Sequence, residues 1–173
     1  MNILSALLLS ATSVAALSDL RTRKIPNWLC YPLAAVAIGV QAHDGVTHAL
    51  LSALCMIGVL AASLPVFSFG WLRGGDVKMI VACCGLVSYP YCIEFLIFTM
   101  LCGGFVAIAV ALRHGTLRRS FRAVGTLAHP LLYGVVPTTL PFTTNKVPYG
   151  VAIFAGAVLT ALSMTALPAL RFF

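Results

Sequence analysis

Six long apolar runs, separated by short polar segments, dominate the pattern of the chain. A helix needs about 20 predominantly apolar residues to cross a bilayer, and several of these runs approach that length. We therefore predict an all-α fold, a polytopic membrane helix bundle with about six transmembrane helices. The predicted spans are residues 2–18, 28–41, 49–69, 79–88, 92–112 and 149–167.

The composition agrees with a membrane protein, because 61% of the residues are hydrophobic and only 9% are charged. About a quarter of a soluble domain is normally charged. The bundle accounts for the whole length, so we expect residues 1–173 to form a single integral membrane domain. The net charge is +7, but the basic residues gather in short loops and no nucleic-acid-binding motif occurs. We therefore expect no nucleic-acid partner.

The positions of the basic residues predict the orientation of the bundle. No basic residue precedes the first apolar run, as one would in a secretory signal peptide, so we interpret this run as a retained span with the N-terminus outside. The loops at about 19–27, 70–78 and 113–148 then face the cytoplasm. They contain ten of the eleven Lys and Arg residues, as the positive-inside rule requires: Arg21, Arg23, Lys24, Arg73, Lys78, Arg113, Arg118, Arg119, Arg122 and Lys146.

Two of the four acidic residues, Asp19 and Asp76, fall on this predicted cytoplasmic face. Carboxylates at the edge of a membrane are costly and are candidates for function. An ionised carboxylate can take a proton from water while a protonated partner donates to a carbonyl oxygen, and such a pair shares one proton. Helix dipoles favour Asp76 as the ionised partner and Asp19 as the protonated one. A contact from Arg21, Arg23 or Lys24 to Asp19 would reverse this assignment.

The remaining polar residues have simpler interpretations. Gly74 and Gly75 would let the backbone come close to a substrate and adopt a positive φ at the junction before Asp76, and Asp76 itself is a suitable helix cap. Asp44 and the histidines around it suit a polar turn, and both Asp44 and Glu94 fall toward the opposite, outer face. The six cysteines lie in or beside apolar runs without a C-x-x-C pair, which favours packing over a zinc site or a disulfide framework. We predict no metal and no cofactor.

Three segments in order resemble motifs of the type IV prepilin peptidases. The first runs from Asp19 to Lys24-Ile25-Pro26-Asn27, the second is Gly74-Gly75-Asp76-Val77-Lys78, and the third is Lys146-Val147-Pro148-Tyr149-Gly150. The short length is most similar to the TadV/CpaA branch of that family, which serves Flp-type (tight-adherence) pili. The resemblance extends over nearly the whole chain.

The resemblance implies an aspartic endopeptidase of the bacterial inner membrane, a multi-pass hydrolase that cuts the leader of prepilins or pseudopilins on the cytoplasmic side. Asp19 and Asp76 match the two catalytic aspartates. One departure occurs, because the family pattern is Gly-x-Gly-Asp and Arg73 stands at the first glycine. The other matched residues are expected to support catalysis or bind substrate: Lys24, Pro26, Asn27, Gly74, Gly75, Lys78, Lys146, Pro148, Tyr149 and Gly150.

Further expectations concern partners and products. Larger relatives carry a cysteine-rich cytoplasmic domain and also N-methylate the new terminus, so we expect cleavage without methylation here. The basic stretch 113–122 is expected to bind anionic lipid headgroups, and the Pro- and Gly-containing stretch 127–140 suits an interfacial or re-entrant piece. Oligomeric state stays open.

Three alternatives remain. A proton-coupled transporter would use the aspartates as a relay. A non-catalytic component of pilus or secretion assembly would explain Arg73. An aspartic peptidase could also act on a different small membrane peptide.

Overall fold

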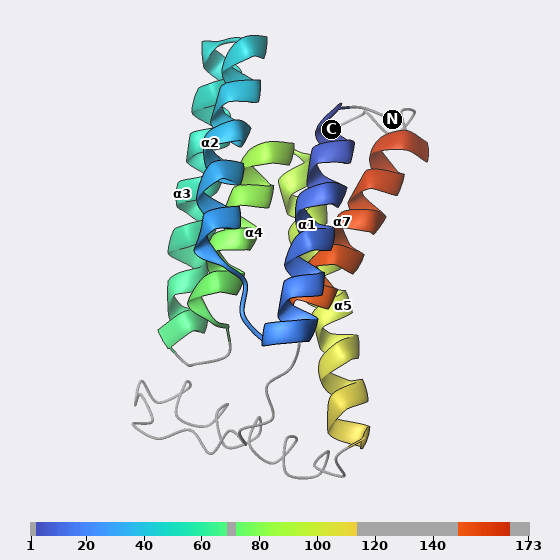
Figure 1. The fold of residues 1–173 in the computed structure, drawn as a ribbon. Helices are drawn as coiled ribbons and strands as arrows, with labels where there is room; N and C mark the ends of the chain where they lie inside the picture. Colours follow the sequence, from blue (N-terminus) through green and yellow to red (C-terminus); the bar gives the residue numbers. More distant parts are fainter. Residues whose placement is uncertain (1–2, 69–71, 114–148, 167–173) are drawn as a thin grey trace, which may run out of the picture. The chain divides into compact units, whose positions relative to one another are not determined.

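The computed structural model of the protein describes residues 3–68, 72–113 and 149–166. These residues form six α-helices and no β-strand (Figure 1). The predicted all-α class is therefore confirmed. The helices are α1 (Ile3–Thr22), α2 (Asn27–Asp44), α3 (Val46–Ser68), α4 (Gly74–Val87), α5 (Tyr91–Arg113) and α7 (Tyr149–Ala166).

Among the described residues, three helical segments are long and apolar enough to cross a membrane. They are Ile3–Thr22, Val46–Ser68 and Tyr91–Val110, and a shorter apolar segment covers Tyr149–Thr165. These segments support a multi-pass membrane protein. The count of six spans and the outside position of the N-terminus stay predictions.

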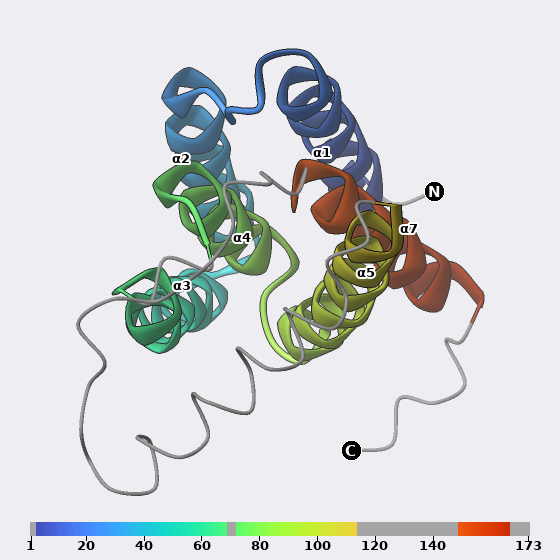
Figure 2. The ribbon, with the colours of Figure 1, turned by 90° about the horizontal axis from the view of Figure 1, so that it is seen from below.

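Residue contacts divide the chain into two units, residues 1–103 with 148–173 and residues 104–147. In the first unit, α2, α3 and α4 pack against one another, while α1 packs along α7 (Figure 2). Helix α5 belongs to the first unit up to Gly103. The expectation of a single domain over residues 1–173 stays a prediction.

Helix α4 is the most buried helix of the first unit, although it has only 14 residues. Almost every side chain from Asp76 to Val87 is buried, as expected for a helix that is apolar on all sides and surrounded by others. In α3, by contrast, Ser52 alone is buried. Its hydroxyl donates to Gly85 O at 2.7 Å, and Gln41 Nε2 donates to Leu86 O at 2.9 Å. These two bonds tie α3 and α2 to α4.

Both aspartates lie on helices, whereas the sequence placed them in loops. Helix α1 extends through Asp19 to Thr22, where Arg23 adopts a left-handed φ of 53° and donates its N–H to Asp19 O at 2.8 Å. This left-handed residue closes the helix. Helix α4 begins at Gly74, after Arg73 in an extended conformation (φ −88°, ψ 156°). The loops expected at 19–27 and 70–78 are correspondingly shorter.

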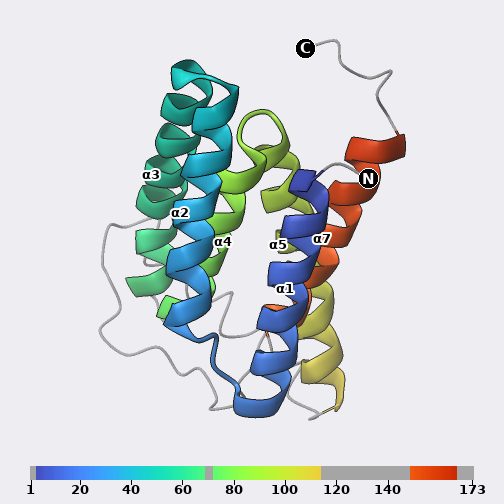
Figure 3. The ribbon, with the colours of Figure 1, turned by 45° about the horizontal axis from the view of Figure 1, so that its top comes forward.

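The first unit has two distinct ends. Figure 3 shows the α1–α2 connection at one end and the short α2–α3 turn at the other. Asp19 and Asp76 lie at the first end, because Asp19 is in the last turn of α1 and Asp76 is in the first turn of α4. Asp44 ends α2 at the opposite end. The assignment of the first end to the cytoplasm stays a prediction.

Candidate functional site

Asp19 is fully buried and faces a helix N-terminus and a cation. Its Oδ2 atom accepts a hydrogen bond from the Gly150 N–H at 2.8 Å. Its Oδ1 atom lies 3.6 Å from Arg73 Nη1 and has no hydrogen-bond partner among the described residues. A buried carboxylate is costly unless opposite charge and donors surround it. Here α7 supplies the donor and Arg73 supplies the charge.

Gly150 permits this arrangement because it has no side chain. A Cβ atom built on Gly150 would lie 2.7 Å from Asp19 Cβ and 3.2 Å from Ala15 O. Any larger residue would therefore separate α7 from α1. Gly150 is the second residue of α7, so the positive end of the α7 dipole points at Asp19.

Asp76 is also buried, with 3% of its surface exposed. Its Oδ2 atom accepts a hydrogen bond from the backbone N–H of Arg73 at 3.2 Å, which caps the start of α4. Asp76 precedes the predicted span 79–88. Burial raises the pKa of Asp76 from 3.8 to about 6, and the charge of Asp19 adds to the rise. The Arg73 N–H and guanidinium oppose it but do not outweigh it.

These contacts argue against the protonation states that the sequence suggested. The prediction from the sequence took into account only the C-terminal end of the first helix beside Asp19. The structure places the N-terminus of α7 there as well. At Asp76, desolvation outweighs the hydrogen bond that the Arg73 N–H donates at the start of α4. The cation beside Asp19 is Arg73 rather than Arg21, Arg23 or Lys24.

Arg73 joins the two aspartates, a role that the sequence did not indicate. Its backbone N–H bonds Asp76, and its guanidinium faces Asp19. The same Nη1 atom donates to Arg23 O at 2.8 Å. Arg73 therefore connects the start of α4 with the end of α1, although 50 residues separate Arg73 from Arg23.

Gly75 lies in close contact with the α1–α2 connection, whereas an approach of Gly74 or Gly75 to a substrate stays a prediction. A Cβ atom on Gly75 would lie 3.0 Å from Ile25 O and 3.3 Å from Ile25 Cβ. Cys30 Sγ lies 3.8 Å from Gly75 O. Gly74 has more room, with the ring of Phe67 at 3.7 Å. Neither glycine has a positive φ. Gly75 therefore lets α4 start directly against the α1–α2 connection.

Lys78 and Asn27 form a polar cluster with Tyr31, which the sequence did not indicate. Lys78 Nζ donates to Tyr31 Oη at 2.9 Å and to Asn27 Oδ1 at 3.3 Å. It also lies 5.0 Å from the centroid of the Tyr31 ring. Pro26 is the N-cap residue of α2. Tyr31 is one helical turn beyond Asn27, and this spacing is a signal that could have identified it.

The remaining predicted residues are placed differently. The main-chain oxygen of Lys24 accepts bonds from Ser18 Oγ and Thr22 Oγ1, and its side chain is exposed. Tyr149 packs on Gly103 of α5, where a Cβ atom would lie 3.1 Å from Tyr149 Oη. Lys146 and Pro148, the basic stretch 113–122 beyond its first residue, and the stretch 127–140 lie outside the described residues.

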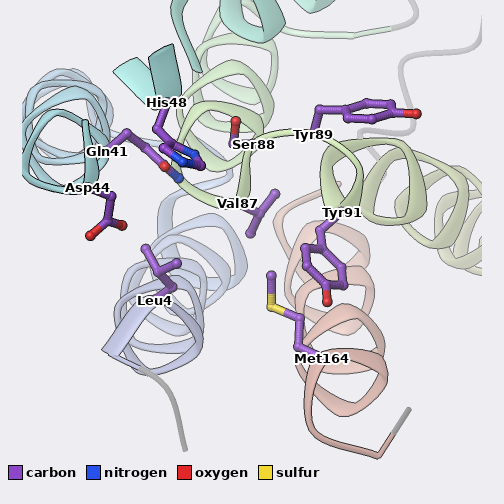
Figure 4. A pocket seen from close by; sticks show the side chains of 9 residues that line it. All are labelled: Leu4, Gln41, Asp44, His48, Val87, Ser88, Tyr89, Tyr91 and Met164. Carbon is purple, nitrogen blue, oxygen red and sulfur yellow. The ribbon is translucent and has the colours of Figure 1, made fainter. Parts of the chain in front are cut away.

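A pocket of about 250 Å³ lies at the other end of the first unit (Figure 4). It adjoins the C-terminal end of α4, whereas Asp76 lies at the N-terminal end, so it is separate from the aspartates. Within the described ranges, no group of three His, Cys, Asp or Glu side chains could hold a metal ion. The residues that line the pocket are Leu4, Gln41, Asp44, His48, Val87, Ser88, Tyr89, Tyr91 and Met164.

The arrangement around Asp19 and Asp76 suits acid–base chemistry on water. Asp19 has a cation and an N–H donor beside it, which favour a negative charge. Asp76 has a pKa of about 6, so it holds a proton more readily than an ordinary carboxyl group. Two carboxyl groups with different environments can take opposite roles in one reaction.

The raised pKa of Asp76 predicts that the protein becomes less stable as pH rises. An unfolded aspartate releases its proton near pH 3.8 and the folded one near pH 6, so the folded state holds more protons between these values. The free energy of unfolding therefore falls as pH rises from about 4 to about 6. Above about pH 6 the contribution of Asp76 no longer changes with pH. Asp76→Asn should remove this dependence and raise the free energy of unfolding at pH 7 by roughly 2–3 kcal/mol.

Thermal unfolding of the detergent-solubilised protein across this pH range would measure the effect. Asp44→Asn is the matched control, because Asp44 lies at the opposite end and its side chain is exposed. Parallel pH curves for wild type and Asp76→Asn would contradict the prediction.

Comparison with known proteins identifies the family. The family model described as the type IV leader peptidase family matches residues 6–108, a range that includes Asp19, Arg73 and Asp76. Searches of curated proteins and of solved structures gave no significant match. The matched range covers more than half of the 173 residues. The chain therefore belongs to the type IV leader peptidase family.

Proposed function

We propose that this protein is an aspartic endopeptidase that removes the leader of Flp-type prepilins at the cytoplasmic face of the bacterial inner membrane. The observation that carries the proposal is the pair of buried aspartates at one end of the helices, connected through Arg73. The match to the type IV leader peptidase family supports the peptidase activity. The three motifs that resemble those of type IV prepilin peptidases support a prepilin leader as the substrate.

Asp19 acts as the general base in this proposal and Asp76 as the general acid. Ionised Asp19 takes a proton from a water molecule, whose oxygen attacks the scissile carbonyl carbon. Protonated Asp76 donates its proton to the carbonyl oxygen. The tetrahedral intermediate then collapses: the leaving nitrogen takes the proton from Asp19, the C–N bond breaks, and one hydroxyl of the re-forming carboxyl group returns a proton to Asp76.

The other matched residues have supporting roles in the proposal. Gly150 holds the α7 N-terminus against Asp19, and Gly75 holds the start of α4 against Ile25. Lys78 and Asn27 fix α4 to α2 beside the site. Lys24, Lys146, Pro148 and Tyr149 would contact the substrate leader or lipid, and the basic stretch 113–122 would bind anionic headgroups.

The position of the aspartates disfavours the transporter alternative. Acidic residues of a proton relay lie near the middle of the membrane, whereas Asp19 and Asp76 lie in the last turn of α1 and the first turn of α4. A non-catalytic assembly component would need neither a buried pair of carboxylates nor a raised pKa at one of them. The experiment below separates these functions.

The test is co-expression of the protein with candidate Flp-type prepilins in a heterologous bacterial membrane. Mass spectrometry of the substrate N-terminus would show removal of the leader, and the same spectra would test for an unmethylated product. We expect cleavage by wild type. A properly inserted wild type that cleaves no candidate would support the assembly component, and proton uptake by vesicles carrying the protein would support the transporter.

A further inference from the structure

We propose that Arg73 is a positioning residue whose positive charge keeps Asp19 ionised in the working aspartate pair. This inference rests on the proposed peptidase function. The family pattern Gly-x-Gly-Asp has glycine at this position, so the inference concerns a feature of this chain. The role follows from where the side chain of Arg73 goes and from what it contacts.

The guanidinium is held in place although its side chain could reach solvent. The side chain of Arg73 is 34% exposed, whereas that of Asp19 is fully buried. Nη1 donates to Arg23 O at 2.8 Å, which directs the guanidinium toward the end of α1. The left-handed Arg23 presents that carbonyl at the point where α1 closes. The guanidinium therefore stays within 3.6 Å of Asp19 Oδ1.

The cap of α4 does not require arginine. Asp76 accepts its hydrogen bond from the backbone N–H of Arg73, and glycine would supply the same N–H. The side chain itself contacts Asp19 and Arg23. The separation of 3.6 Å exceeds hydrogen-bond distance, and Asp19 Oδ1 accepts no hydrogen bond from the described residues. The interaction depends mainly on charge, so lysine should be able to replace arginine.

Few other titratable groups act on the pair. Asp19 and Arg73 act on Asp76, and Tyr149 from α7 and Cys30 from α2 interact with it electrostatically. Lys78 lies on α4 but bonds Asn27 and Tyr31 of α2. Arg73 is the cation that contacts Asp19 among the described residues.

Loss of the cation predicts a shift in the pH dependence of cleavage. A nearby positive charge favours the ionised carboxylate, and its removal means that a higher pH is needed to ionise the pair. The acidic limb of the cleavage rate should move to higher pH by roughly one unit in Arg73→Gln and Arg73→Gly. Because Arg73 is partly exposed, solvent screens its charge. The expected shift of the acidic limb is therefore at the low end of the range that a charge in contact produces.

The experiment measures cleavage of a Flp-type prepilin by purified wild type, Arg73→Gln, Arg73→Gly and Arg73→Lys in detergent between pH 4 and pH 9. Arg21→Gln is the matched control, because it removes a charge from the exposed surface of the same helix end. We expect both neutral variants to shift the acidic limb. In Arg73→Lys and Arg21→Gln, the acidic limb of the pH–rate profile should lie at the wild-type pH.

Three results would overturn the role of Arg73. The first is an acidic limb of the pH–rate profile that lies at the wild-type pH in folded Arg73→Gln or folded Arg73→Gly. The second is a shift in Arg21→Gln as large as that in Arg73→Gln. The third is a folded Arg73→Lys variant that behaves like Arg73→Gln or is inactive at every pH. Wild-type protein that cleaves nothing at any pH would instead count against the proposed function, so the two failures are distinguishable.

Discussion

Asparagine at Asp19 or at Asp76 should lower the rate of leader cleavage by roughly 10³–10⁴-fold while leaving the protein inserted and folded. Asparagine keeps the shape of the carboxylate and one acceptor oxygen. It can therefore still accept the N–H of Gly150 at position 19 or the N–H of Arg73 at position 76. The proton that each residue must take or give is lost. The substitution thus removes the chemistry and keeps the hydrogen bonds that hold the helix ends.

The double variant adds a sharper test of a shared mechanism. When two groups act as a unit, removing the second costs little once the first is gone. The double variant with asparagine at both positions should therefore be no slower than either single variant. Asp44→Asn, at the opposite end of α2, should cleave at the wild-type rate. More than a tenth of wild-type activity in either single variant would exclude that aspartate from the acid–base pair.

The hydrophobic pattern predicted the helices well, because it depends on local sequence. The apolar run 92–112 corresponds closely to α5, and the run 49–69 corresponds to α3. The helix ends near Asp19 and Asp76 were less well predicted. Polar residues such as Arg21 and Thr22 suggested a loop, but hydrogen bonding within α1 continues until the left-handed Arg23.

The pairing of Asp19 and Asp76 at one end was predictable from the positive-inside rule, whereas their partners were not. The hydrogen bond between Gly150 and Asp19 joins residues 131 positions apart. The dipole of α7 therefore acts on Asp19, an effect that no local property of either segment reveals. Arg73 seemed a departure from a glycine pattern, and its contact with the end of α1 depends on how α4 packs. Such contacts are determined by tertiary packing.

Gly150→Ala should be among the most damaging substitutions outside the aspartates. An added Cβ atom would lie 2.7 Å from Asp19 Cβ and 3.1 Å from Asp19 Oδ2. Neither neighbour can move away easily, because Asp19 is fully buried and Ala15 O lies on the same side at 3.2 Å. Helix α7 must therefore shift away from α1, and the hydrogen bond from the Gly150 N–H to Asp19 must lengthen or break.

The expected cost has a structural part and a catalytic part. Overpacking of a tight contact costs about 1–3 kcal/mol in the free energy of unfolding. A displacement of about 1 Å at a catalytic group lowers the rate by roughly 10²-fold. Gly39→Ala in α2 is the matched control, because no atom lies within 4 Å of a Cβ atom built there. Alanine also favours a helix over glycine, so Gly39→Ala should keep wild-type stability and activity.

Thermal unfolding and cleavage of the same prepilin, measured on both variants, separate these two parts. If Gly150→Ala lowers cleavage by much more than its loss of folded protein explains, the α7 N-terminus contributes to the site through Asp19. Equal losses of folded protein and of activity would assign Gly150 to helix packing alone. Wild-type stability and wild-type cleavage in Gly150→Ala would contradict the close contact of α1 and α7 at Asp19, and with it the proposed setting of the general base.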